Sequence, residues 1–293
     1  MMPYAANTNR EIVVCAIIAC MGMATPMYSQ DGVAASRDSG AENFSKFQFT
    51  DRFIPYEMMY FASEPGFLSD HRGSNAKFQI SFAFRLFGLS APGPNEDSAR
   101  SDGLYLSYTQ LSFWDTASSS KPFYDSSYKP ELWWRQHIPL GTWCQSSEIE
   151  GGYAHESNGR GGIESRSVDR LFIRPVLGIA LDNDIILNLK PRVFCYIDKS
   201  DNPDIDRYRG YADLSCSIGK EHGLQVDLLG RIGSDGRHGC LQTELTYPLD
   251  VLTGGHAAGY LYLQSFVGYS ETLLDYDQRT DQPRILLGIA LVR

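Results

Sequence analysis

The sequence predicts an all-β protein built from many short antiparallel strands. Three observations predict this fold class: segments in which apolar and polar residues alternate, turn-forming residues between those segments, and few stretches with the periodicity of an amphipathic helix. Aromatic residues make up 12% of the chain, and several of them lie at the ends of the alternating segments. At about 10 residues per strand plus turns, the alternating part of the chain holds roughly 10–14 strands.

The beginning of the chain has the features of a secretory signal peptide, which we assign to residues 1–29. Arg10 supplies the positive charge, residues 12–19 form an apolar core too short to span a membrane, and small residues follow. The residues that end at Cys20 also resemble a lipoprotein cleavage site, so lipid modification of Cys20 is an alternative.

Residues 30–46 are small and polar, and we expect them to form a flexible segment. The strand-rich domain is expected to extend from residue 47 to residue 293. No run in it approaches 18 apolar residues, so the sequence predicts no helical membrane anchor.

The clearest strand lies within residues 77–88. Alternate positions of this segment carry the apolar side chains Phe78, Ile80, Phe82, Phe84 and Leu86, and the positions between them carry Gln79, Ser81, Ala83 and Arg85. Four further segments have a weaker strand pattern: LYLSYTQLSFW, GLQVDLLGRIG, YLQSFVGYS and RILLGIALVR. Turn-forming residues near 91–95, 182–184 and 254–255 separate such segments.

Two ways of closing these strands remain open from the pattern alone. A soluble sandwich or lipocalin-like barrel has its apolar faces inside, whereas an outer-membrane barrel has them outside and is girdled by aromatic residues. The mean hydropathy of −0.27, together with very apolar single faces, favours the membrane barrel.

Charge and cysteine content exclude some functions. A net charge of −9 argues against a nucleic-acid partner. Four cysteines follow the signal and show no spacing typical of a zinc site: Cys144, Cys195, Cys216 and Cys240. Three of them lie in strand-like runs, where we expect small apolar roles, and disulfides remain open.

One hairpin combines residues that are typical of nucleophilic catalysis. His155 and Ser157 share a face of a strand, and a turn after them brings Asp169 to the neighbouring strand. Ser157 is then the candidate nucleophile, His155 the candidate base and Asp169 the group that orients the imidazole, while the N–H of Gly159 can point at an oxyanion. By itself, however, His-x-Ser is more often a strand edge with polar residues facing water.

The segment HESNGRxxxxSRSxDRL, residues 155–171, resembles the active-site signature HDSNGRxxxxSRSxNRL of bacterial outer-membrane phospholipase A. Four further blocks are similar to blocks of this family in the same order: KFQISFAF from Lys77, SYTQLSFW from Ser107, Pro122-Phe with Tyr128-x-Pro-Glu, and DNPDI from Asp201 with Tyr208-x-Gly-Tyr. The resemblance extends from about residue 47 to the end of the chain.

The resemblance implies a twelve-stranded antiparallel transmembrane β-barrel in the bacterial outer membrane, with the catalytic residues on its lipid-facing wall. It implies a calcium-dependent phospholipase A that hydrolyses acyl esters of phospholipids and lysophospholipids and is active as a homodimer. Matching by position makes His155 the base and Ser157 the nucleophile. Asp169 stands where the family has Asn, and a carboxylate there stabilises an imidazolium by its charge as well as by a hydrogen bond.

The same resemblance implies the calcium ligands and a dimer contact. The ligands are the carbonyl of Arg160 and the hydroxyl of Ser165, with Ser120 contributed by the partner subunit and Asp201 nearby, all hard oxygen donors of the kind calcium prefers. Gln110 matches a lipid-facing polar residue that bonds across the dimer. A non-catalytic porin-like or structural barrel and a soluble secreted esterase are the competing hypotheses.

Overall fold

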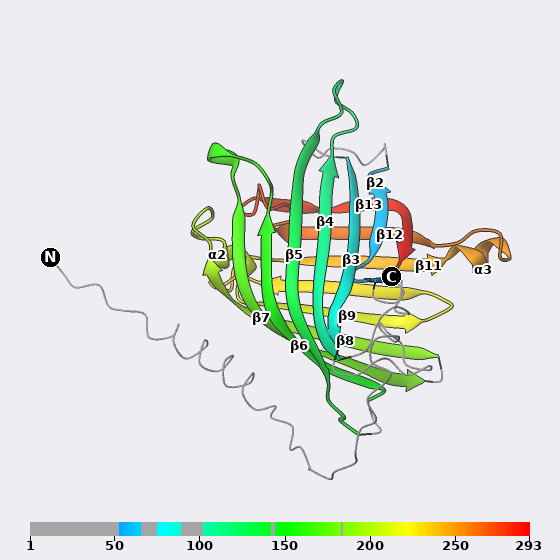
Figure 1. Cartoon of the computed structure of the whole chain (residues 1–293). Coiled ribbons are helices and arrows are strands. Elements are labelled where there is room, and N and C mark those ends of the chain that lie inside the picture. Colours follow the sequence, from blue (N-terminus) through cyan, green and yellow to red (C-terminus); the bar gives the residue numbers. More distant parts are fainter. Residues whose placement is uncertain (1–52, 66–74, 89–101, 142–143, 183) are drawn as a thin grey trace, which may run out of the picture. The chain divides into compact units, whose positions relative to one another are not determined.

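The structure is a computed structural model that describes residues 53–65, 75–88, 102–141, 144–182 and 184–293 (Figure 1). The expected signal peptide and flexible segment lie outside these residues. The strands are β1 Phe53–Pro55, β2 Met59–Ser63, β3 Ala76–Gly88, β4 Gly103–Trp114, β5 Phe123–His137, β6 Ser146–Ser157, β7 Ser167–Asp182, β8 Ile185–Asp198, β9 Ala212–Lys220, β10 Gln225–Ile232, β11 Gly239–Pro248, β12 Tyr260–Tyr269 and β13 Arg279–Val292.

The strands form one closed antiparallel ring. From β2 to β13 each strand pairs with its neighbour in sequence, and β13 then pairs with β2, which closes the sheet. β1 and β2 both pair with the same edge of β3, so they are two pieces of one strand interrupted at residues 56–58. The ring therefore has twelve positions, which confirms the expected twelve-stranded barrel. The pairing of β13 with β2 joins the two ends of the sheet, and closure of this kind pairs backbone groups that lipid would leave without a partner.

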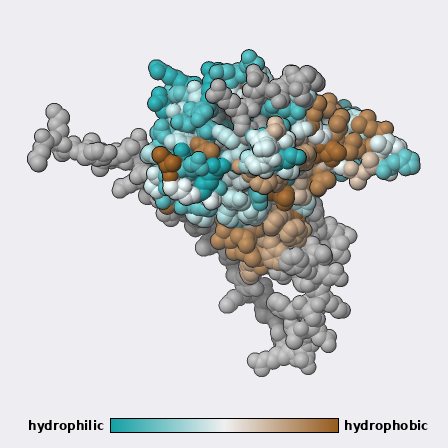
Figure 2. All heavy atoms as spheres, turned by 90° about the horizontal axis from the view of Figure 1, so that it is seen from above, coloured by the Kyte–Doolittle hydropathy of each residue, from teal (hydrophilic) through white to brown (hydrophobic). Residues whose placement is uncertain are grey.

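The apolar faces of the strands point outward. In β3, Ile80 is 48% exposed and Leu86 is 42% exposed, whereas Ser81 is fully buried and Arg85 is 4% exposed. Figure 2 shows apolar side chains gathered in patches on the surface beside a hydrophilic area. A soluble barrel would bury its apolar faces, so this orientation supports the membrane barrel.

The interior of the barrel is filled by polar and aromatic side chains. Trp133 and Tyr105 stack at a centroid distance of 4.4 Å, and Lys77 donates to Gln264 across the interior at 2.8 Å. Arg284 is paired with Glu64 at 2.7 Å. Polar groups far from water need such partners.

Alternate connections gather at each end of the barrel, because neighbouring strands are antiparallel. One end carries residues 158–166 with a short 3-10 turn at Gly162–Glu164, residues 199–211 with α2 at Asp206–Arg209, and residues 270–278. The other end carries α3 at Leu249–Thr253. Among the described residues, no helix is long and apolar enough to cross a membrane.

All five strand segments predicted from alternation are strands, namely β3, β4, β10, β12 and β13. Cys144, Cys195, Cys216 and Cys240 are free thiols, and Cys144 is buried. Of the two roles left open for these cysteines, the structure therefore favours small packing residues over disulfides.

Candidate active site

The β6–β7 hairpin brings the three predicted catalytic residues to one surface. His155 lies directly opposite Asp169 in the register, and Ser157 lies opposite Ser167. Tyr153, on the same face of β6, is 39% exposed, while Ala154 and Glu156 between these residues are buried. The alternation of a strand therefore places all three candidates on the outer, lipid-facing wall.

His155 and Asp169 are in direct contact. The Nδ1 atom of His155 lies 2.7 Å from Oδ1 of Asp169, and both side chains are partly exposed. With Nδ1 facing the carboxylate, Nε2 is the ring nitrogen left for a second partner. In the described part of the chain, the Ser157 hydroxyl makes no hydrogen bond to this ring. Such contacts often tighten only when substrate is bound.

Tyr153 is a neighbour of the triad that the sequence interpretation missed. Its hydroxyl donates to Oδ1 of Asp169 at 2.6 Å, so this carboxylate oxygen faces both Tyr153 and His155. The spacing in the sequence could have indicated Tyr153, because positions 153, 155 and 157 share one face of a strand. Two groups thus hold Asp169 in a single orientation.

Gly159 begins the loop after Ser157 in a conformation that favours glycine. Its φ is +67°, and a Cβ atom added there would lie 2.9 Å from the ring of Tyr128. Both facts make a side chain at this position costly. The absence of a side chain leaves the backbone of Gly159 free of bulk, which an oxyanion site built from its N–H would require.

Asn158, buried beside Gly159, organises the loop. Its Oδ1 accepts from the N–H groups of Arg160 and Arg166 at 3.2 and 3.1 Å, and its Nδ2 donates to the carbonyl of Glu164 at 2.8 Å. One side chain thus joins both ends of the loop. Sequence reasoning gave Asn158 no role, since its three partners are backbone groups.

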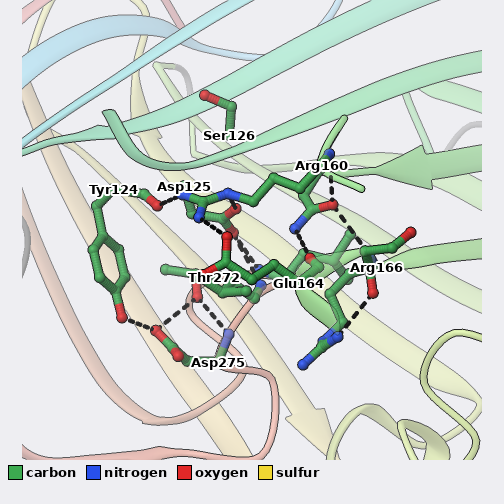
Figure 3. Close-up of polar contacts among 12 residues, drawn as sticks. Tyr124, Asp125, Ser126, Arg160, Glu164, Arg166, Thr272 and Asp275 are labelled. Carbon is green, nitrogen blue, oxygen red and sulfur yellow. Dashed lines mark hydrogen bonds and ion pairs between the residues drawn. The ribbon is translucent and has the colours of Figure 1, made fainter. Parts of the chain in front are cut away.

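The β6–β7 connection, residues 158–166, is called the catalytic loop after the candidate residues beside it, and the side chain of Arg160 ties it to the rest of the barrel mouth (Figure 3). Its guanidinium donates to Glu164 at 2.6 Å and to the carbonyl of Tyr124, and its Nε lies 3.9 Å from Oδ1 of buried Asp125. Asp125 in turn accepts the N–H groups of Leu273 and Leu274 through Oδ2. Strand β5 and the 270–278 loop therefore support the catalytic loop.

A cavity of about 550 Å³ opens beside this network. Its lining includes Tyr124, Arg160, Glu164, Arg166 and Asp275. Tyr124 donates to Asp275 at 2.5 Å, and Arg166 donates to the carbonyls of Ile163 and Ser165 (Figure 3). These polar groups are thus engaged with one another at the mouth of the barrel.

Two of the predicted calcium ligands are in contact. Ser165 donates to Oδ2 of Asp201 at 2.9 Å, and Ser167 donates to the same oxygen at 3.1 Å. Ser120 lies exposed in the β4–β5 connection, and among the described residues no hydrogen bond joins it to Ser165. The described residues hold no group of three His, Cys, Asp or Glu side chains suited to a metal.

The loop that carries Asp201 is held by a charged contact near α2. Lys199 donates to Asp206 and to the carbonyl of Pro203, and Ser234 donates to Asp206 at 3.2 Å. Partial burial alone would raise the pKa of the Asp206 carboxyl, but Lys199 and Ser234 lower it below the usual value. Asp206 thus stays ionised and fixes the loop at neutral pH.

Gln110 lies on the outer face of β4. Leu106 on the same face is 46% exposed, whereas Tyr105, Ser107 and Thr109 on the other face are buried. Its Nε2 donates to Ser112 at 3.1 Å. A polar side chain on an outer face is the kind of group that seeks a partner in lipid.

Comparison with known proteins identifies the family. A family model described as phospholipase A1 matches residues 55–291. The phospholipases A1 of Salmonella typhimurium and Escherichia coli (strain K12) are each 33% identical over 225 residues, which cover 75% of this chain and 70% of the relative.

Solved structures agree with this similarity. An active-site mutant of outer membrane phospholipase A from Escherichia coli, in which an asparagine is replaced by alanine, superposes with a TM-score of 0.65 at 28% identity and covers 84% of this chain and 93% of that chain. The Salmonella typhi outer membrane phospholipase, solved as a dimer with bound calcium, gives a TM-score of 0.65 at 28% identity and covers 82% of this chain and 92% of that chain. The chain therefore belongs to the phospholipase A1 family and is a phospholipase of the outer membrane.

Proposed function

We propose that Ser157, His155 and Asp169 hydrolyse acyl ester bonds of phospholipids and lysophospholipids at the lipid-facing wall of the barrel. The observation that carries this proposal is the 2.7 Å contact between His155 and Asp169, on the same outer face as Ser157. A triad on this wall meets the ester of a membrane lipid directly, whereas a triad inside the filled barrel would not.

In the first half of the reaction, the Ser157 hydroxyl attacks the acyl carbonyl. His155 takes the hydroxyl proton on Nε2, and Asp169 at Nδ1 stabilises the imidazolium that forms. The N–H of Gly159 donates to the oxyanion of the tetrahedral intermediate. When the intermediate collapses, His155 returns the proton to the leaving oxygen, and a lysophospholipid departs from acylated Ser157.

In the second half, His155 accepts a proton from a water molecule that attacks the acyl group. Collapse of this intermediate releases the fatty acid and restores the hydroxyl of Ser157. For a lysophospholipid, the alcohol released in the first half lacks both acyl chains. Both halves use the same three side chains, so loss of any one affects acylation and deacylation alike.

Asp169 stands where the related signature has Asn. We propose that the carboxylate serves the same orienting role and adds charge stabilisation of the imidazolium. Its two short contacts, from Tyr153 and with His155, support an orienting role. An amide at this position would orient the ring by hydrogen bonding alone.

We further propose that calcium binds at the catalytic loop in a dimer of this chain. The Arg160 carbonyl and the Ser165 hydroxyl would hold it, with Asp201 adjacent and Ser120 from a second copy. The adjacency of Ser165 and Asp201, both oxygen donors, fits a hard cation. When bound, calcium supplies positive charge that stabilises an oxyanion. Gln110 on the outer face of β4 would bond to the second copy.

Lipid hydrolysis by purified protein in detergent micelles tests the proposal. Wild type and Ser157→Ala are each assayed with calcium and with chelator, and folding of both is verified by the heat-dependent gel mobility of barrels. We expect activity only in wild type with calcium. Full activity of Ser157→Ala would refute the triad, and unchanged activity in chelator would refute the calcium proposal alone.

A further inference from the structure

A buried carboxylate lies directly behind the triad, on the inner face of the same hairpin. Glu156 occupies the β6 position between His155 and Ser157, and its side chain is 4% exposed. Its Oε2 accepts from Nη2 of Arg170 at 3.0 Å and from Nη1 of Arg209 at 2.8 Å. Both guanidinium groups are buried, so one carboxylate oxygen joins two charges in the interior.

This contact spans the same two strands as the triad. Arg170 follows Asp169 on β7, as Glu156 follows His155 on β6. On the outer face, His155 contacts Asp169, and on the inner face, Glu156 contacts Arg170. Because the backbone joins the two faces rigidly, any sliding or rotation of β6 against β7 would disturb both contacts. The two pairs therefore fix one register from opposite sides.

The second arginine brings in a loop from elsewhere in the barrel. Arg209 ends α2, and its Nε donates to the hydroxyl of Ser270 at 2.6 Å. The same β8–β9 connection also contacts the rim of the hairpin, where Asn202 donates to the carbonyl of Ser167 at 2.6 Å. This connection thus holds the hairpin from inside through Arg209 and at its rim through Asn202.

We propose that Glu156 is a positioning residue for the hydrolysis. Its carboxylate, held by Arg170 and Arg209, sets the relative placement of His155, Ser157 and Asp169. Glu156 contacts no substrate, because it points into the barrel while the triad faces lipid. Its removal should therefore lower turnover rather than weaken substrate binding.

The physical reason for the expected loss of turnover is the positive charge of the two arginines that remains when the carboxylate is removed. Replacing Glu156 by Gln leaves two buried guanidinium groups side by side without the anion between them. They repel each other in an interior where screening is weak. Arg170 can relieve this only by moving, and Asp169 is joined to it by one peptide unit.

The experiment measures kcat and KM for hydrolysis of a soluble ester substrate by detergent-solubilised protein. The variants are Glu156→Gln, Arg209→Gln and Glu64→Gln. Glu64 is the matched control, because it is equally buried and paired with Arg284 on β13, far around the ring from β6. We expect Glu156→Gln to lower kcat by about 10- to 100-fold, as small displacements of catalytic groups do. KM should change by less than about twofold.

Arg209→Gln should lower kcat less than Glu156→Gln does, because Glu156 keeps its contact with Arg170. If Glu156→Gln does not fold, Arg209→Gln provides the test instead. The rate of covalent labelling of Ser157 by an organophosphate should fall in parallel with kcat. Glu64→Gln should retain wild-type kcat when folded. Glu156→Asp, which keeps the charge, should recover part of the loss.

The positioning role of Glu156 rests on the proposed triad. The outcomes distinguish a failure of the positioning role from a failure of the triad. If Ser157→Ala remains active, the triad itself is wrong. If Ser157→Ala is inactive while folded Glu156→Gln or Arg209→Gln keeps wild-type kcat, only the positioning role fails. An equal loss of kcat in Glu64→Gln would also overturn it, since the effect would then be general to the barrel.

Discussion

The outer and inner faces of the β6–β7 hairpin differ in where their polar residues lie. Midway along the hairpin the outer face is apolar, with Ile149, Leu171 and Ile173, and the catalytic candidates occur only near the loop end. The inner face carries charged residues along its length, including Glu150 and Arg174, and these pair with other interior groups.

This difference distinguishes structural from chemical roles. A charge inside the barrel is matched by a partner and contributes to stability, whereas a polar group on the lipid-facing wall is expensive and needs another reason to be there. The three candidate residues lie at the loop end of the hairpin, beside the mouth of the barrel. We therefore expect outer-face changes to affect catalysis and inner-face changes to affect stability, with Glu156 as the inner-face exception because it lies directly behind the candidate residues.

Asp169→Ala should have the largest effect. Without an acceptor at Nδ1, the His155 ring loses its orientation, and we expect kcat to fall about 10³-fold, or about 4 kcal/mol of transition-state stabilisation. Asp169→Asn should retain activity within about tenfold, or about 1.4 kcal/mol, because the related signature carries Asn at this position. Steady-state hydrolysis in micelles measures both, and equal losses in the two variants would contradict the orienting role.

Glu150→Gln should show the opposite pattern. Glu150 is buried and contacts Arg135 and Arg174 at 2.6 and 2.5 Å, so loss of its charge should destabilise the barrel by about 3 kcal/mol. Urea unfolding in detergent measures this change. The kcat of folded protein should remain that of wild type, and a large loss of kcat at unchanged stability would remove the distinction between the faces.

Tyr153→Phe should have a smaller effect on the outer face. It removes one of the two contacts to Asp169 Oδ1 and leaves His155 in place. A hydrogen bond to a charged group is worth about 1.5–3 kcal/mol, less where it is exposed, so we expect kcat to fall about three- to tenfold. Thermal stability should not change, and a fall in stability without a fall in kcat would assign Tyr153 a packing role.

Replacement of Asp235, in the turn between β10 and β11, should have the smallest effect, and that effect should be on stability. The N–H of Arg237 and the ring of His238 hold the pKa of this carboxyl well below its usual value. A lowered folded-state pKa stabilises the protein above the unfolded pKa of about 3.9, and the benefit is lost as pH falls further.

Asp235→Asn should therefore lower the melting temperature slightly at pH 7, and its difference from wild type should shrink below pH 4. Arg237→Ala is the control, since it keeps the backbone N–H and should match wild type at both values. A difference that is independent of pH would show that the charge of Asp235 plays no part.

The sequence predicted the strands well, but not which way they faced. Alternation in residues 77–88 predicts a strand with one apolar face, yet a strand of a soluble barrel has the same pattern. The orientation follows from the closed ring, which places Lys77 and Arg85 in the interior, where Lys77 donates to Gln264 on β12. Such partners are far apart in sequence, so no local pattern indicates them.

The site was predicted only in part, because local spacing indicates contacts within one hairpin but not contacts between distant elements. His155, Ser157 and Asp169 belong to one hairpin, so spacing and register are enough to bring His155 opposite Asp169. The contacts of Arg160 with β5 and of Glu156 with Arg209 cross between elements. Sequence reasoning considered Arg160 only for its carbonyl and gave Glu156 no role.

We propose that Ser157 on the lipid-facing wall forms the acyl-enzyme. The most direct test is to inactivate the protein in micelles with a phosphonate analogue of a phospholipid ester and to locate the adduct by mass spectrometry. We expect one adduct, on the peptide that contains Ser157, and none on that peptide in Ser157→Ala. An adduct on a different residue, or inactivation with Ser157 unmodified, would contradict it.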